Sequence, residues 1–314
     1  MTAKELEARQ AMKDAMKPLA VLALVLALPA GTAAAGEKED VMWSRLRARV
    51  QDVEKRLDGV LGLSVKDLKT GTTFEVRPDE VFPQASSIKL AVLYELYRQA
   101  EEGKIDLGQV TRPPLPRVKG GGILQSLGDK VSLTWRDLAV LTAVLSDNEA
   151  ANVLIGRIGM SAVNKRLEDD LDLDQTRLRR RMMDIEAAQR GDENVGTPAE
   201  MRRLMEFIYE GKGLSPAAAR DLREVLAIPR PSAFRKGLPE GVTVLDKDGE
   251  LEAVRCDTAL VDLPHRPYAV SIGTTFLKRD EDGEAAIKEI SAALYEMFDR
   301  LSRSSDLGRV ISDK

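Results

Sequence analysis

The spacing of apolar residues predicts a helix, a β-hairpin, a long helical region, three strands and a final helix. The first helix is indicated by apolar residues at helical spacing, namely Val41, Met42, Leu46, Val50, Val53 and Leu57. The segments "GLSVKDL" and "TTFEVR" read as the two strands of a hairpin around a turn at 69–71. From about 83 to 227 the spacing is mostly helical, and several segments begin with Ser or Thr and end near Gly, as helices do.

Strand patterns return in "VTVLDK", "AVRCDTALVDL" and "PYAVSIGTTFL", and a helix from about 283 to 302 has one apolar face. Strands joined by short turns pair antiparallel, and terminal helices with one apolar face cover a sheet. The predicted fold class is therefore α/β (α+β): an antiparallel five-stranded sheet flanked by N- and C-terminal helices, with an all-helical subdomain inserted.

We expect a single module over residues 36–303, with an α/β half made from 41–80 and 240–303 and a helical half from 81–239. Residues 304–314 are expected to be a flexible tail. The cleft between the two halves is the natural place for a site.

The first 35 residues have the pattern of a secretory signal peptide. Lysines precede an apolar run from about 19 to 28, and Ala33 and Ala35 supply the small residues of a cleavage site before Gly36. The run is short for a membrane span, so no stable span is expected, and an uncleaved anchor is the alternative. The polar lead is longer than a signal needs, so Met12 or Met16 could be the true start. We expect an exported protein, periplasmic or secreted.

Composition excludes several kinds of site. The net charge of −4 comes with no basic stripe, so a nucleic-acid partner is not expected. The chain has a single histidine, His265, and a single cysteine, Cys256, which are too few for the usual zinc site and for an intrachain disulfide. His265 stands in "DLPHRPY", which is typical of a turn between strands. A serine enzyme built on this chain would therefore need a base other than histidine.

Three short motifs could supply such an enzyme, although each has a structural alternative. Ser86 and Lys89 share one face at the start of a helix, and a buried lysine can lose its proton and act as a base. The alternative is that Ser86 caps the helix while Lys89 is solvated. Ser146 and Asn148, in "SDN", could relay a proton and hold a substrate amide, or they could cap a helix. Lys247, in "LDKDGE", would add positive charge to a cleft or be solvated at the strand end.

In this order and on these elements, the motifs resemble the S-x-x-K, S-D-N and K-T-G set of class A β-lactamases and penicillin-binding proteins. The resemblance covers nearly all of the chain after the signal, including "FPQASSIKLAVL", "LTWRDLAVLTAVLSDNEAANVLIGRIG" and "DLDQTRLRRRMMD". The chain is therefore similar to this serine-hydrolase superfamily, in a divergent branch related to class A. The resemblance implies the β-lactamase/transpeptidase-like fold and no metal or organic cofactor.

The resemblance also implies roles for the catalytic residues. Ser86 would be the acylated nucleophile, and Lys89 would be its base or part of the proton path. Ser146 would pass a proton to the leaving nitrogen. Lys247 would attract the substrate carboxylate and shape the electric field on Ser146.

On the binding side, the resemblance makes Asn148 the residue that holds the substrate amide. The oxyanion hole would consist of the backbone amides of Ser86 and Glu250, and Gly249 would also belong to the substrate-binding residues. Each such donor contributes about 3 kcal/mol to stabilising the transition state.

The third motif departs from the family, because it reads Lys-Asp-Gly in place of Lys-Thr-Gly. Asp248 would repel a substrate anion if it faced the cleft, whereas strand alternation could turn it away from the side of Lys247. Arg255 on the next strand could bind the carboxylate, could neutralise Asp248, or could be an ordinary exposed arginine.

A second departure concerns deacylation. Class A enzymes carry a glutamate in an E-x-x-L-N loop that activates the deacylating water, and the matching region here places Met182 at that position. Methionine cannot accept a proton. The nearby carboxylates Asp184 and Glu186 could substitute if the loop folds differently, or they could be structural and pair with arginines 179–181.

The resemblance implies an exported serine hydrolase of the class A β-lactamase type. It would hydrolyse β-lactam amides through an acyl-enzyme on Ser86, with slow deacylation because Met182 replaces the usual glutamate. The alternatives are a peptidoglycan D,D-peptidase or esterase of the same fold, and a penicillin-binding envelope protein that does not turn over. The expected partner is a β-lactam or peptidoglycan-like small molecule, and the expected state is a monomer.

Overall fold

The structure, a computed structural model, describes residues 32–305 and 307–311 and forms one compact unit from Lys38 onward. The helices are α2 (Thr32–Arg56), α3 (Lys89–Glu101), α4 (Trp135–Val144), α5 (Asn148–Ile158), α6 (Met160–Lys165), α7 (Ile185–Gln189), α8 (Pro198–Glu210), α9 (Pro216–Ala227) and α10 (Asp280–Ser302). The strands are β1 (Val60–Asp67), β2 (Thr73–Val76), β3 (Phe82–Pro83), β4 (Val110–Thr111), β5 (Leu133–Thr134), β6 (Val195–Gly196), β7 (Val244–Leu251), β8 (Val254–Val261) and β9 (Tyr268–Thr275).

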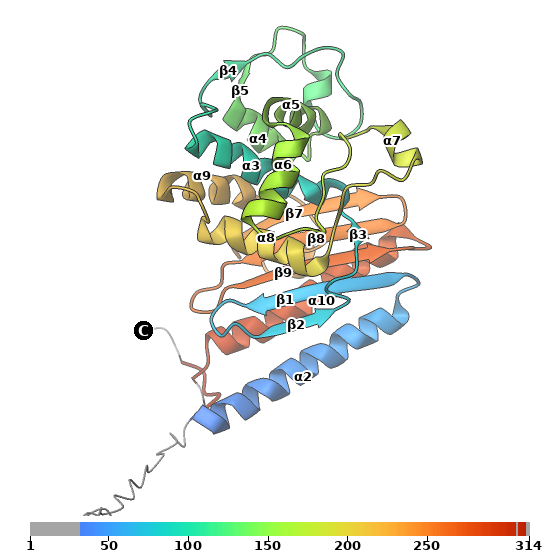
Figure 1. The fold of residues 1–314 in the computed structure, drawn as a ribbon. Helices are drawn as coiled ribbons and strands as arrows, with labels where there is room; N and C mark the ends of the chain where they lie inside the picture. The colour runs from blue at the N-terminus through green and yellow to red at the C-terminus, as the bar shows by residue number, and fades with distance from the viewer. Residues whose placement is uncertain (1–31, 306, 312–314) are drawn as a thin grey trace, which may run out of the picture. The chain divides into compact units, whose positions relative to one another are not determined.

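Strands from both ends of the chain form one antiparallel five-stranded sheet in the order β2-β1-β9-β8-β7. The predicted hairpin corresponds to β1 and β2, and the three later predicted strands correspond to β7, β8 and β9. The predicted fold class is therefore confirmed. Strand β1 pairs with β9, which joins the first strand of the chain to the last (Figure 1). Strand β7 lies at the edge of the sheet, where its outer side is free to border a site.

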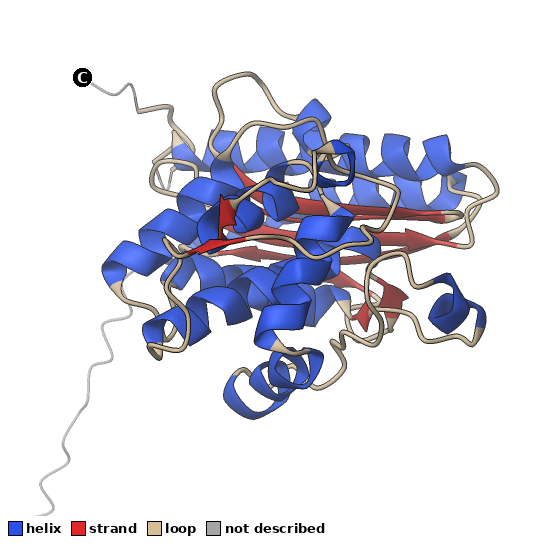
Figure 2. Cartoon of the chain, turned by 90° about the horizontal axis from the view of Figure 1, so that it is seen from above, coloured by secondary structure: helices blue, strands red, loops and turns tan. Residues whose placement is uncertain are grey.

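Helices cover both faces of the sheet (Figure 2). On one face, Trp43 and Leu46 of α2 share an apolar cluster with Ile290 and Phe298 of α10 and with the sheet. On the other face, α8 packs on β1, β8 and β9, and the remaining helices continue outward from it (Figure 1). The sheet is therefore buried on both faces, with the long helical insertion on one of them.

Several helices begin as the sequence predicts. Thr134 caps α4 in a reciprocal capping box with Asp137, and Thr197 and Ser215 cap α8 and α9. Proline occupies the first turn of both α8 and α9, where its missing N–H is no loss. These caps fix where the helices start and so hold the loops between them.

The sequence did not predict the two-residue strands β3 to β6, which pair as β3 with β6 and β4 with β5. Such strands are too short to show an alternating pattern. In the expected flexible tail, the described residues form a tight turn, in which the Ser305 amide donates to the Arg309 carbonyl at 2.8 Å.

No helix in the described part of the chain is long and apolar enough to cross a membrane. The apolar run at 19–28 lies outside the described residues, and α2 begins at Thr32, before the expected cleavage site. The signal peptide, export and the monomeric state therefore stay predictions.

Candidate active site

Ser86 lies in a single 3₁₀ turn (Ala85–Ile88) that leads directly into α3. The neighbouring Ser87 donates its hydroxyl back to the Gln84 carbonyl at 2.7 Å, whereas neither the turn nor α3 has a side-chain cap. The Ser86 hydroxyl instead accepts a hydrogen bond from the amine of Lys89 at 2.9 Å. This geometry is that of a nucleophile beside its base, and the capping alternative does not describe it.

Lys89 is the centre of the site, because its side chain is completely buried and its amine contacts both motifs. Besides Ser86 Oγ, Nζ donates to the Ser146 carbonyl at 2.7 Å and to Asn148 Oδ1 at 2.8 Å, and it lies 3.1 Å from Ser146 Oγ. Burial, and then the positive charge of Lys247, hold the pKa of Lys89 well below its ordinary value. Lys89 can therefore be neutral and take the proton of Ser86.

The SDN segment is held in place by Asp147, a residue to which the sequence analysis gave no role. Ser146 has a left-handed backbone (φ 49°), and the fully buried Asp147 caps α5 through the Ala150 amide. The other oxygen of Asp147 accepts from the amides of Ile123 and Leu124, both at 2.7 Å. Asp147 thus ties the loop at 120–124 to the motif and orients Ser146 toward Lys89.

The glycine triplet at 120–122 forms the neighbouring wall of the site. All three glycines have positive φ, and a Cβ on Gly122 would lie 2.2 Å from the Asp147 carboxylate. The Asn148 amide donates to the Gly120 carbonyl while its oxygen accepts from Lys89. No role could be assigned to this segment from its sequence, and its close approach to the motif became visible only in the structure.

Lys247 is completely buried on β7, and its amine donates to the Asp248 carboxylate at 2.8 Å and to the Asp248 carbonyl at 2.9 Å. Among the described residues no hydrogen bond joins Lys247 to Ser146. Lys247 therefore acts on the site through its charge, which lowers the pKa of Lys89, and not through a direct bond to the relay serine.

Gly249 packs directly against the nucleophile turn. A Cβ at this position would lie 2.5 Å from the Gln84 carbonyl, 2.7 Å from Cys256 Sγ and 2.9 Å from the Ser86 amide nitrogen. Real Cβ atoms essentially never come so close, so only glycine fits. The next residue, Glu250, has an exposed side chain on the edge strand.

Replacing Gly249 by alanine will displace the nucleophile turn. We expect the free energy of unfolding to fall by about 1–3 kcal/mol, the usual cost of overpacking, and acylation of Ser86 to slow. Urea unfolding and acylation kinetics measure the two effects. Gly128→Ala is the matched control, because a Cβ there meets nothing within 4 Å; equal behaviour of the two variants would contradict this account of Gly249.

A model described as "Beta-lactamase enzyme family" matches residues 45–298. The chain belongs to this family. Its relatives include β-lactamase PSE-4 of Pseudomonas aeruginosa, which is 24% identical over 299 residues, covering 90% of this chain and 99% of PSE-4. The β-lactamase of Rhodobacter capsulatus is 28% identical over 277 residues, covering 84% of this chain and 89% of the relative.

A solved structure of a PBP-A mutant, an acyl-enzyme complex with penicillin G, superposes with a TM-score of 0.74 at 26% identity. The superposition covers 82% of this chain and 97% of that protein. The membership in the β-lactamase family and the β-lactamase/transpeptidase-like fold that the sequence predicted are thus both confirmed.

In this β-lactamase-family chain, Met182 is clamped by the side chain of Asn152. The Met182 amide donates to Asn152 Oδ1 at 2.8 Å, and Asn152 Nδ2 donates to the Met182 carbonyl at 3.0 Å. Asn152 stands about one helical turn after Asn148 on α5, so the two side chains share a face about 6 Å apart along the axis. The same face of α5 therefore holds both the Lys89 network, through Asn148, and the backbone of Met182, through Asn152.

The two carboxylates considered as substitutes lie at the start of α7. Asp184 accepts from the Ala187 amide at 3.0 Å as the cap of α7, and Glu186 is exposed in its first turn. In the described residues neither carboxylate contacts Ser86 or Lys89. Asp184 thus has a structural role as a helix cap, and within residues 32–305 and 307–311 no carboxylate is hydrogen-bonded to the nucleophile.

Arg255 lies on β8 but does not reach the site. Its guanidinium pairs with Asp280 at 3.1 Å and with Glu284 at 3.3 Å, both in the first turns of α10. It anchors that helix to the sheet. Besides Lys247, Asp248 pairs with Arg230, at 2.5 Å. Arg230 could not be identified from the sequence, because it precedes strand β7 by many residues.

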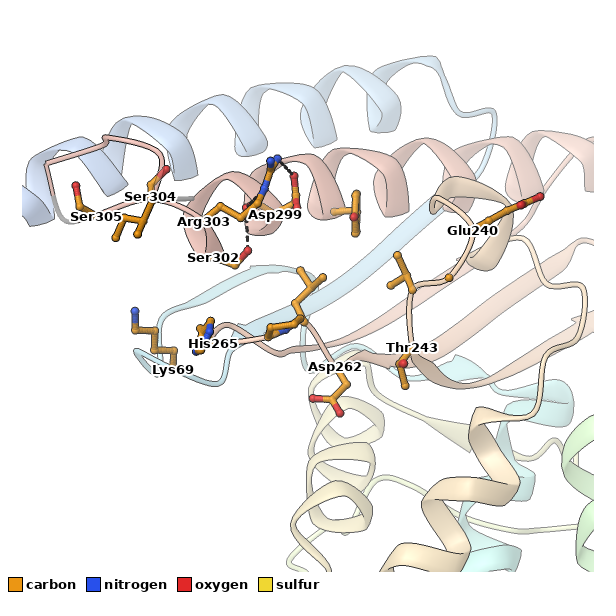
Figure 3. Close-up of a pocket in the computed structure, with 16 residues that line it drawn as sticks. Lys69, Glu240, Thr243, Asp262, His265, Asp299, Ser302, Arg303, Ser304 and Ser305 are labelled. Atoms are coloured by element: carbon orange, nitrogen blue, oxygen red, sulfur yellow. Dashed lines mark hydrogen bonds and ion pairs between the residues drawn. The ribbon is translucent and has the colours of Figure 1, made fainter. Parts of the chain in front are cut away.

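His265 lies on the turn between β8 and β9, as the sequence predicts, with a left-handed backbone (φ 66°). It borders a cavity of about 1030 Å³ that also includes Ser302 and Asp299 of α10 (Figure 3). There Ser302 donates to the Asp299 carbonyl at 2.8 Å, and in the described part of the chain no hydrogen bond joins His265 to a serine or an aspartate. The cavity contains none of the motif residues, so this histidine does not form a catalytic triad.

No cluster of three or more potential metal ligands exists among the described residues.

Proposed function

We propose that this protein is a serine acyl-transfer enzyme of the class A β-lactamase type, which β-lactam amides acylate at Ser86. The observation that supports the proposal most strongly is the buried amine of Lys89, bonded at once to Ser86, Ser146 and Asn148. A lysine in this position serves as the base that the single histidine cannot supply.

In the proposed reaction, Ser86 Oγ attacks the lactam carbonyl carbon while its proton passes to Lys89 Nζ. The C–N bond then breaks, and the proton reaches the leaving nitrogen from Lys89 through the hydroxyl of Ser146. The Ser86 amide, at the start of a helix and beside Gly249, supports the oxyanion. The product is an acyl-ester on Ser86 with the lactam ring opened.

We further propose that the acyl-ester is released slowly. Hydrolysis needs a base that activates water, and in the described residues no carboxylate contacts Ser86. Met182, at the position that the family resemblance assigns to a glutamate, cannot accept a proton. Without that base, deacylation loses on the order of the 10²–10⁴-fold that general base catalysis contributes.

Intact-mass spectrometry after mixing with penicillin G tests both parts of this proposal. We expect a mass increase equal to one penicillin per chain that decays slowly once it has formed. An adduct that is lost within seconds would contradict slow release. The absence of any adduct would contradict the proposed acylation, and hydrolysis of D-Ala-D-Ala peptides without an adduct would indicate a peptidase.

A further inference from the structure

Asp248 joins Lys247 and Arg230 into one network of charges. Its Oδ1 atom lies 2.8 Å from Lys247 Nζ and 2.5 Å from Arg230 Nη1. Arg230 also lies 3.0 Å from Asp246, which pairs with Arg235 at 2.8 Å. Both cations are therefore engaged by the protein's own carboxylates.

The carboxylate is the exposed member of this network. The side chain of Asp248 is 21% exposed, whereas those of Arg230 and Lys247 are 5% and 0% exposed. Although burial alone would raise it, the charges of Lys247 and Arg230 hold the pKa of Asp248 well below its ordinary value. A molecule that enters here therefore meets an ionised carboxylate before it meets a cation.

A third carboxylate, Asp257, stands opposite Asp248 in the pairing of β7 with β8. It is completely buried, and one of its oxygens has no hydrogen-bond partner. Burial, and then the charges of Asp246 and Asp248, raise its pKa well above the ordinary value, which favours its protonated form. Asp248 is thus the carboxylate of this facing pair whose ionised form the neighbouring cations stabilise.

Asp248 stands in sequence between two residues that act on the catalytic residues. The residue that follows it, Gly249, touches the Ser86 amide, and the residue that precedes it, Lys247, acts on the pKa of Lys89. The alternative anion partner suggested by the sequence, Arg255, is occupied by Asp280 and Glu284. The three cations considered for this end of the site, Lys247, Arg230 and Arg255, are thus all paired with carboxylates.

We propose that the subsite formed by Lys247, Asp248 and Arg230 takes a neutral or cationic hydrogen-bond donor, such as a carboxamide, a hydroxyl or an ammonium group, in place of a carboxylate. The inference rests on the proposed function, since it names the substrate class of the same site. The natural acyl donor would then carry no free carboxylate next to the scissile amide. An incoming donor would bond to the partly exposed carboxylate of Asp248, whereas an incoming carboxylate would face like charge.

The test is noncovalent binding to the Ser86→Ala protein, which separates recognition from acylation. Penicillin G, its methyl ester and its primary amide differ only at the carboxyl group, and calorimetry gives the dissociation constant of each. We expect the amide to bind tightest and the free acid to bind at least about tenfold more weakly than the amide, because contact between like charges readily costs one decade of affinity.

Adding Asp248→Thr to the Ser86→Ala protein should raise the affinity for the acid relative to the amide at least about tenfold. Asp248→Asn, which keeps the shape, should do the same, while Glu252→Thr, which removes an exposed carboxylate from the β7–β8 turn, should leave the ratio unchanged. Tighter binding of the acid than of the amide, or binding of none of the three, would overturn the inference. Failure of the wild-type protein to be acylated would instead overturn the proposed function, so the two failures are distinguishable.

Discussion

Replacing Lys89 by methionine will slow the acylation of Ser86 by roughly 10²–10⁴-fold, the range that a positioned general base contributes. Methionine has a similar length and fills the same buried space, but it cannot take the proton of Ser86 Oγ, which now lies 2.9 Å from the amine. Stopped-flow mixing with a chromogenic cephalosporin, combined with intact-mass analysis, measures the rate.

The same group sets the pH dependence of acylation. Because burial and Lys247 lower the pKa of Lys89, the amine is neutral at a lower pH than an ordinary lysine. The acylation rate of the wild-type protein should fall as the pH falls through this lowered pKa. The residual acylation rate of the Lys89→Met variant should not show this fall.

Unfolding of the variant will not explain its slow acylation. A lysine with a lowered pKa binds fewer protons in the folded state than in the unfolded state, so at neutral pH its burial opposes folding and the stability rises with pH. Removing this buried amine stabilises the fold and so offsets the loss of its hydrogen bonds. We therefore expect the melting temperature to change little. Lys104→Met, at an exposed lysine, is the matched control. Acylation of Lys89→Met within a few-fold of the control would contradict the role of Lys89.

Replacing Met182 by glutamate will speed deacylation by roughly 10²-fold or more, because it supplies a general base at the position that the family resemblance assigns to the deacylating glutamate. The backbone of Met182 is already fixed by two hydrogen bonds with the side chain of Asn152, so the new carboxylate starts from a defined position. The decay of the penicillin adduct, followed by intact mass, gives the rate directly.

Met182→Gln is the control for this variant, since glutamine has the same shape and polarity but cannot take a proton at neutral pH. It should release the acyl group as slowly as the wild-type protein. Equal rates for the Glu and Gln variants, whether both fast or both slow, would mean that a missing base at position 182 does not limit deacylation.

The sequence was sufficient to predict the fold because the alternating pattern of the strands and the helical spacing of the apolar residues are long and regular. The strands β1, β7, β8 and β9 each run for eight residues, and α10 keeps one apolar face over 23 residues. The two-residue strands were missed, because their position is set by tertiary contacts and not by a local pattern.

At the site, the sequence could identify Ser86, Lys89, Ser146 and Asn148, and the structure brings these four together around one amine. It could not identify their supports. Asp147 and Asn152 act by bonding backbone groups 23 and 30 residues away, and no periodicity encodes such pairings.

The charge pattern around Lys247 was the least predictable part. Strand alternation could not say whether Asp248 faces the site, because its orientation depends on Arg230, which reaches it from another segment. Arg255 was a reasonable candidate to bind the substrate carboxylate, because the sequence alone could not show its ion-pair partners. In the structure the carboxylates of α10 engage it. Ion pairs between distant segments decide such questions, and a sequence alone does not list them.

The central claim is that Ser86 is the residue that the substrate acylates. Its most direct test is peptide mapping of the penicillin G adduct, performed on the wild-type and Ser86→Ala proteins side by side. The account predicts one adduct on the peptide that contains Ser86 in the wild-type protein and none in the variant, with both proteins melting at similar temperatures. An adduct on another residue, or an undiminished adduct in Ser86→Ala, would contradict it.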